Sequence, residues 1–179
     1  MQKLTENIQM IRTDERTCSN IYLLDNGKGE KLIIDSGDGG VQELDSLTPT
    51  YTFLTHSHHD HSGGVKPDWQ NVYLHERDFV KLLFRIVPKN ARAYDFKNFK
   101  WGTFNLEIYW TPGHTEGSIC ILEKNNGLLF SGDTKFADGD RGRTDLPGGN
   151  EEKIIDSLKF IDKLDYKLLC PGHGPTEQK

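Results

Sequence analysis

Ligand-type side chains fill five of the six positions in His56-Ser57-His58-His59-Asp60-His61. An apolar run precedes this segment and a pair of glycines follows it, which is typical of a strand that ends in a loop. Alternate side chains of an extended segment point the same way, so His56 and His58 can bind one ion. Asp60 and His61, around the turn, can face a second ion. Imidazole nitrogens and carboxylate oxygens are ligands that zinc accepts, so the pattern predicts a metal site, with His59 facing away.

Four other apolar runs end in loops marked by Gly or Pro that carry a His or an Asp. Reactive side chains on the exit loops of a rigid sheet are a common way to build an active site. Two ions that share one carboxylate can hold a bridging hydroxide and polarise a substrate carbonyl. His75 begins an expected helix and is not expected to bind metal. The four further candidates are Asp35, His114, Asp133 and His173.

Short runs rich in Ile, Leu, Val, Phe and Tyr predict strands, and two longer amphipathic stretches predict helices. One helix is expected over residues 76–87, ending before Pro88, and another over 151–164, capped by Asn150. A shorter helix is expected at 41–47. Many strands and few helices predict an α/β (α+β) fold, with helices outside packed sheets and one domain over residues 1–179. Strands are expected at 8–11, 20–24, 31–34, 51–54, 71–74, 106–110, 118–122, 128–130 and 167–170.

The composition is typical of a soluble globular protein. The net charge of −5 disfavours binding to nucleic acid or to an anionic membrane through bulk charge. No apolar run is long enough for a membrane helix, and the N-terminal residues lack the apolar core of a secretory signal, so a cytoplasmic location is expected. Cys18, Cys120 and Cys170 stand in strand-like runs and are expected to be buried and not to form disulfides.

The order of these motifs from Asp35 to His173 resembles the metallo-β-lactamase superfamily. The resemblance implies a four-layer αββα sandwich with two divalent metal ions at one edge of its sheets. Zinc is the expected metal, and iron and manganese accept the same ligand set. Asp35 would orient the metal loop without binding metal. The resemblance assigns the first ion to His56, His58 and His114, the second to Asp60, His61 and His173, and the bridging position to Asp133.

A second segment, 142–149, reads Gly-Arg-Thr-Asp-Leu-Pro-Gly-Gly and resembles the signature of small glyoxalase II-like hydrolases. This implies cleavage of a hydroxyacyl thioester by a bridging hydroxide, with Asp60 and Asp133 as catalytic residues. Arg143 is a candidate for binding a substrate carboxylate, and an ion pair with Asp145 is its alternative role. Glu116 and Lys135 depart from the residues common in this group, which affects the expected substrate and not the metal ligands.

Other functions share parts of this pattern. Persulfide dioxygenases, which use one iron, also carry the Gly-Arg-Thr-Asp segment. A lactonase would use the same hydroxide attack on a cyclic ester. A non-catalytic metal-binding domain would need fewer ligands, because structural zinc sites are closed by four. Zinc β-lactamases tend to lack an aspartate where Asp133 stands, so hydrolysis of penicillins is not expected.

Overall fold

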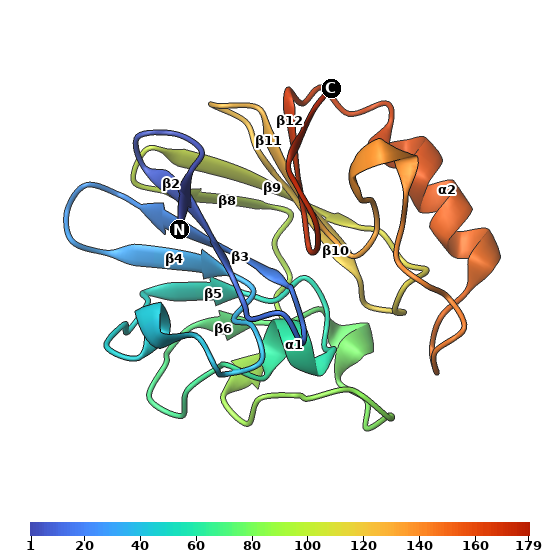
Figure 1. Ribbon diagram of the computed structural model, residues 1–179, viewed down its shortest axis with the longest axis horizontal. Helices are drawn as coiled ribbons and strands as arrows, with labels where there is room; N and C mark the ends of the chain where they lie inside the picture. Colours follow the sequence, from blue (N-terminus) through green and yellow to red (C-terminus); the bar gives the residue numbers. More distant parts are fainter. The chain divides into compact units, whose positions relative to one another are not determined.

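The computed structural model describes residues 1–179, which form two compact units, Met1–Tyr94 and Asp95–Lys179. Each unit contains one sheet (Figure 1). The chain is thus mixed α/β with two sheets and few helices, which confirms the expected fold class. The expectation of one domain over 1–179 stays a prediction. No helix in the chain has the length and apolar character needed to cross a membrane.

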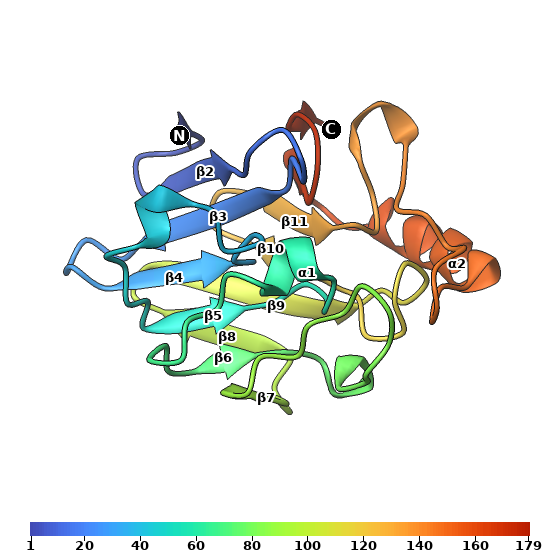
Figure 2. The ribbon, with the colours of Figure 1, turned by 60° about the horizontal axis from the view of Figure 1, so that its bottom comes forward.

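The first unit carries a seven-stranded sheet whose strands follow one another in chain order. Strands β1 to β4 are antiparallel, and β4 to β7 are parallel (Figure 2). Because parallel strands end at the same edge, the loops that follow β4 and β5 leave the sheet together. Those loops carry Asp35 and His56. The strands are β1 Gln2–Lys3, β2 Ile8–Arg12, β3 Asn20–Asp25, β4 Lys31–Ile34, β5 Tyr51–Phe53, β6 Val72–Tyr73 and β7 Ala91–Arg92.

The second unit carries a six-stranded sheet in the order β13-β12-β11-β10-β9-β8. Only β11 and β12 pair in parallel, and β10 is antiparallel to both β9 and β11. Strands β9, β11 and β12 therefore run in one direction, and the loops after them, with His114, Asp133 and His173, leave the same edge. The strands are β8 Asn98–Trp101, β9 Phe104–Trp110, β10 Ile119–Glu123, β11 Leu128–Gly132, β12 Leu168–Pro171 and β13 Glu177–Gln178.

Each unit has its own buried cluster, in which side chains from neighbouring strands pack together. In the first, Trp69 is buried and its indole nitrogen donates to the Leu47 carbonyl at 3.0 Å. In the second, Ile161 packs against strand residues such as Leu122 and Leu169. Cys120 and Cys170 are buried as expected. The expectation for Cys18 is wrong, since it lies in a turn, half-buried, with a φ of +53°.

The predicted helix over 151–164 is confirmed as α2, Glu151–Ile161, and the side chain of Asn150 accepts from the Lys153 backbone N–H at 2.9 Å. Its buried face includes Ile154, as the amphipathic pattern requires. The second helix, α1, is a single turn over His59–Ser62. The short helix expected at 41–47 is only the 3₁₀ turn Gln42–Leu44.

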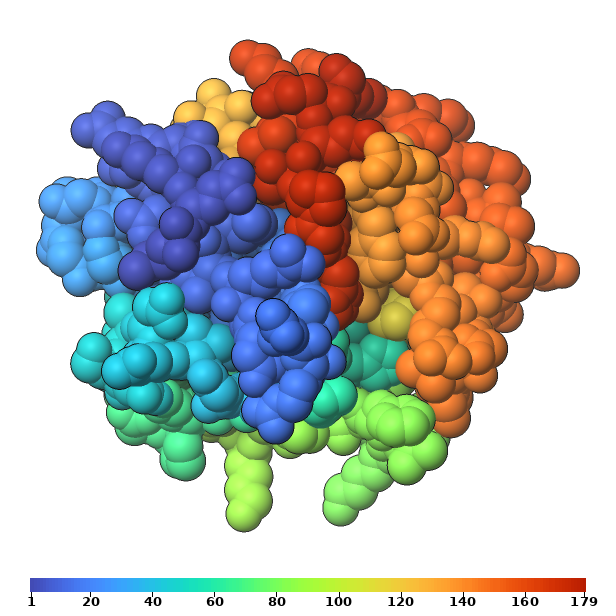
Figure 3. Space-filling view, viewed as in Figure 1, coloured from blue at the N-terminus to red at the C-terminus, as the bar shows by residue number.

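The predicted helix over 76–87 is wrong. Only the 3₁₀ turn Glu76–Asp78 forms, and residues 79–86 are irregular. Their backbone bonds to the segment of the clustered histidines instead: the His59 N–H donates to the Phe84 carbonyl at 2.9 Å, and the Ile86 N–H donates to the Ser57 carbonyl at 2.8 Å. The apolar residues of 79–86 thus stay largely exposed, and the light-green atoms of this segment lie on the surface in Figure 3.

Candidate metal centre

The histidines that follow β5 lie together in the first unit. The ring centre of His56 is 4.8 Å from that of His58 and 4.2 Å from that of His61. All three side chains are buried. A carboxylate oxygen of Asp60 lies 3.6 Å from Nε2 of His61. Three imidazoles and one carboxylate are therefore gathered in a space that the surrounding loops shield from water.

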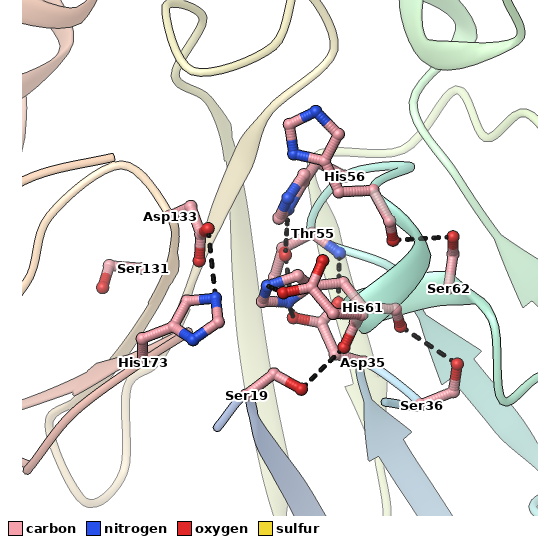
Figure 4. Close-up of polar contacts among 12 residues, drawn as sticks. Ser19, Asp35, Ser36, Thr55, His56, His61, Ser62, Ser131, Asp133 and His173 are labelled. Atoms are coloured by element: carbon pink, nitrogen blue, oxygen red, sulfur yellow. Dashed lines mark hydrogen bonds and ion pairs between the residues drawn. The ribbon is translucent and has the colours of Figure 1, made fainter. Parts of the chain in front are cut away.

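Asp35 supports this cluster from the end of β4. One carboxylate oxygen accepts from the Thr55 backbone N–H at 2.7 Å. The other accepts from the Thr55 hydroxyl and is bonded to Nδ1 of His61, each at 2.8 Å (Figure 4). Asp35 has a φ of +60°, a conformation that non-glycine residues rarely adopt. Such a backbone persists only where the surroundings enforce it, and here the enforced position faces the histidines.

These contacts determine which nitrogen of each ring carries hydrogen. A carboxylate accepts, so His61 donates through Nδ1 to Asp35. The Thr55 hydroxyl gives its hydrogen to Asp35, so its oxygen accepts from Nδ1 of His56 at 3.1 Å. Both neutral rings then carry a lone pair on Nε2, which is the atom a metal ion binds. Thr55, which the sequence reasoning overlooked, is thus part of the support.

Serine hydroxyls hold the backbone of the same loop. Ser19 donates to the Asp60 carbonyl at 2.7 Å, and Ser36 donates to the His61 carbonyl at 3.0 Å (Figure 4). The Ser62 hydroxyl oxygen lies 2.7 Å from the Ile86 carbonyl oxygen and 2.9 Å from the His58 carbonyl oxygen, so either can accept its hydrogen. Supported in this way, the ligand-type side chains need little reordering to bind an ion. No motif in the sequence marks these serines.

In the second unit, one carboxylate oxygen lies between two imidazoles. Oδ2 of Asp133 is 3.4 Å from Nε2 of His173 (Figure 4). The same oxygen is 3.4 Å from Nε2 of His114. Nδ1 of His114 is bonded to the Arg143 carbonyl at 2.8 Å, and a carbonyl only accepts, so Nδ1 carries the hydrogen. In the neutral ring, Nε2 then turns a lone pair toward a carboxylate. A cation between the two atoms would be favourable, and the donor chemistry fits a divalent metal ion.

The Gly-Arg-Thr-Asp segment supports His114 through its backbone. A Cβ atom on Gly142 would lie 2.0 Å from the Asp133 carbonyl oxygen and 2.8 Å from Nδ1 of His114, so only glycine fits. The next residue supplies the carbonyl that binds the His114 ring. The sequence identified the segment, but not this physical reason for it.

The Arg143 side chain forms an ion pair with Asp145. Its Nε and Nη2 atoms lie 2.7 and 2.5 Å from the two carboxylate oxygens, and the arginine side chain is 61% exposed. Bonding to Arg143 lowers the pKa of Asp145 to about 2. The alternative role considered from the sequence is therefore the contact that forms, and a substrate contact stays a prediction.

Helix α2 supports the loop between β9 and His114. The Asn150 N–H donates to the Gly113 carbonyl at 2.7 Å, and the Ser157 hydroxyl donates to the Pro112 carbonyl at 2.7 Å. Gly113 has a φ of +143°, and a Cβ atom there would lie 2.4 Å from Ile154. The helix and the loop are thus in close contact, which fixes the position of the loop on α2.

The remaining polar residues singled out from the sequence make local contacts. The His59 side chain is 49% exposed. His75 accepts from the Arg77 backbone N–H through Nδ1 and caps a 3₁₀ turn. Glu116 pairs with Lys153, and Lys135 pairs with Asp162.

Residues 17–173 match the model of the metallo-beta-lactamase superfamily. The chain belongs to the metallo-β-lactamase superfamily. It is a metal-dependent hydrolase of that superfamily, with a set of His and Asp side chains able to bind metal ions.

Members with similar sequences or structures cover nearly the whole chain. Hydroxyacylglutathione hydrolase GloC of Haemophilus influenzae is 32% identical and aligns with 94% of this chain and 85% of its own. The crystal structure of BLEG-1 B3 metallo-beta-lactamase superposes with a TM-score of 0.79 at 30% identity, covering 96% of this chain and 93% of that one. The crystal structure of TTHA1623 in a di-iron-bound form superposes with a TM-score of 0.76 at 28% identity, covering 95% of this chain and 94% of that one.

Proposed function

We propose that the donors of the two units bind two divalent ions. His56, His58 and His114 would hold one ion, Asp60, His61 and His173 the other, and Asp133 would bridge them. The lone pairs on Nε2 of His56, His61 and His114 support this assignment, since each ring has its Nδ1 held by a neighbour. The di-iron form of TTHA1623 supports the number of ions. Zinc is the proposed metal, with iron or manganese as substitutes.

The proposed reaction is hydrolysis of a hydroxyacyl thioester, and the similarity to GloC over 94% of the chain carries this proposal. When bound, the ions would supply a hydroxide at neutral pH and polarise the acyl oxygen. A thiol nucleophile is disfavoured in Cys120, because burial raises the pKa of its thiol to about 11. Water, as hydroxide supplied by the bound ions, is the proposed nucleophile.

The chain's own residues have distinct proposed roles in this reaction. Asp133 places its carboxylate between two imidazoles, where it would bind the ions that these rings hold. Asp60 is half-buried beside His61 and would hold a proton while the thiol departs. Arg143 would bind a substrate carboxylate in place of Asp145, its present ion-pair partner, whose side chain is exposed. Asp35 would act only through His61 and Thr55.

The proposed setting is the cytoplasm, with a small acyl thioester or ester as the partner. The net charge of −5 supports a preference for small molecules over nucleic acid or membrane surfaces.

The test begins with elemental analysis of protein purified without added metal or chelator, followed by a substrate panel. We expect about two ions per chain and release of free thiol from a hydroxyacyl thioester of glutathione. Chelation should abolish this activity, and zinc should restore it. D133A should lose activity, whereas D156N, at an exposed position on α2, should keep it. Full turnover by D133A would contradict the two-ion mechanism.

Hydrolysis of β-lactams is a second candidate, which the similarity to BLEG-1 favours. The same panel should therefore contain a chromogenic cephalosporin and a lactone, and oxygen uptake should be followed with glutathione persulfide. Faster turnover of the cephalosporin or lactone than of the thioester would replace the proposed substrate. Oxygen uptake together with one iron per chain would replace hydrolysis by dioxygenation.

A further inference from the structure

A buried ion pair lies behind the clustered histidines in the first unit. Nη1 of Arg85 is 2.9 Å from Oδ1 of Asp78, and both side chains are fully buried. Removing two charges from water is costly, so a buried pair is weak evidence for stability and is retained best where it specifies a geometry. None of the roles proposed above uses this pair.

The pair contacts the peptide that separates two of the proposed metal ligands. The second oxygen of Asp78 accepts from the Ser57 backbone N–H at 2.8 Å, in a fully buried hydrogen bond. On the other side, the Ser57 carbonyl accepts from the Ile86 N–H at 2.8 Å, and Arg85 forms a β-bridge with His58. The backbone N–H and the carbonyl of Ser57 are thus both hydrogen-bonded to residues 78–86, the segment that contains the ion pair.

The conformation at Ser57 sets how the neighbouring histidines lie. His56 and His58 point to one side only while the residue between them stays extended. The segment that holds Ser57 has little packing of its own, since Leu83 is 67% exposed and Phe84 is 51% exposed. The ion pair is therefore a fully buried side-chain link that, together with the backbone bonds of Phe84 and Ile86, keeps this segment against the histidines.

We propose that Asp78 and Arg85 are positioning residues for the His56 and His58 ligand pair, acting through Ser57. The inference rests on the proposed metal site and adds an asymmetry to it. Asp60 and His61 are held by other groups, namely Ser19, Ser36 and Asp35. Loss of the ion pair should thus weaken binding of the ion held by His56 and His58 and leave binding of the other ion unchanged.

Cobalt titration tests this asymmetry, because the visible spectrum of Co²⁺ reports its coordination. In D78N one of the two ions should bind about 10- to 100-fold more weakly, the range typical of groups that orient a metal ligand, and the other should bind as in the wild type. R85K, which keeps the charge, should show a smaller loss. The control D156N removes an exposed carboxylate and should match the wild type.

Amide hydrogen exchange in the metal-free protein gives a second readout. The Ser57 amide should exchange faster in D78N than in the wild type, whereas in D156N it should exchange as in the wild type. If D78N does not fold, R85K provides both measurements. Unchanged cobalt binding and unchanged exchange at Ser57 would overturn the inference, as would equal weakening of both ions. A wild-type protein that binds no metal would overturn the proposed function, while the exchange experiment would still decide the role of Asp78.

Discussion

Nδ1 of His61 lies 2.8 Å from Oδ2 of Asp35, and both side chains are buried. The same carboxylate oxygen accepts the Thr55 hydroxyl hydrogen, and that hydroxyl oxygen faces Nδ1 of His56. One aspartate therefore determines the protonation of two histidine rings, one directly and one through a threonine. This relationship gives the first prediction.

Replacing Asp35 with Asn should weaken metal binding without removing a ligand. An amide has one acceptor oxygen, so it cannot receive all three hydrogens that Asp35 now accepts. We expect a 10- to 100-fold loss of metal affinity, measured by competition with a chelator, and a parallel loss of activity. D68N, at an exposed position in the same unit, serves as the control. Wild-type affinity in D35N would show that the carboxylate does not orient these rings.

Replacing Gly142 with Ala should destabilise the second unit at the His114 loop. The added Cβ would lie 2.0 Å from the Asp133 carbonyl oxygen, so the backbone must move. We expect unfolding to become easier by about 1–3 kcal/mol, the usual cost of overpacking, together with loss of activity. Denaturant unfolding of G40A provides the comparison, because the nearest atom to a Cβ there is a carboxylate oxygen at 3.4 Å. Equal stability of the two variants would contradict the steric argument.

The protonation of His75 should make the fold less stable in mild acid. Burial lowers the pKa of this ring below its ordinary value of 6.5, so the unfolded chain takes up the proton more readily than the folded one. The contribution of neutral His75 to the free energy of unfolding is therefore fully present above pH 6.5 and is lost as the pH falls through 6.5 toward the folded-state pKa. In metal-free protein, the wild type should lose more thermal stability than H75N between neutral and mildly acidic pH. A pKa of His75 at or above 6.5 by NMR would refute this.

Thiol reactivity should distinguish the three cysteines. Burial raises the pKa values of the Cys120 and Cys170 thiols, whereas Cys18 is half-buried in a turn. A chromogenic disulfide reagent should label one thiol per native chain. The other two thiols should react only when the chain unfolds. C18S should abolish the native reaction. Native labelling that persists in C18S would show that a buried thiol is accessible.

The long strands, α2 and the positions of the ligand-type residues could be predicted from the sequence, because each depends on a local pattern. Lys31–Ile34 is an apolar run bounded by turn residues, and Asn150 caps α2 as its side chain predicts. The short strands β1, β7 and β13 were not predicted, since their residues are mostly polar and none is buried. Strand β8 was also missed, although Asn98-Phe99-Lys100-Trp101 alternates polar and apolar residues as a half-buried strand does.

The supporting contacts of the candidate site depend on residues far apart in the chain. The residues 79–86 satisfy an amphipathic helix pattern, but their backbone bonds to Ser57 and His59 outweigh that local preference. Likewise, Thr55 and Ser19 are ordinary polar residues until the fold places them against Asp35 and Asp60. Such long-range hydrogen bonds leave no spacing that a pattern could reveal.

The carbonyl of Arg143 and the bare Cα of Gly142 together determine how the His114 ring lies. In this chain the side chain of the arginine turns outward to Asp145. The Gly-Arg-Thr-Asp segment is therefore a marker for how one imidazole is oriented, and enzymes with different substrates can share it.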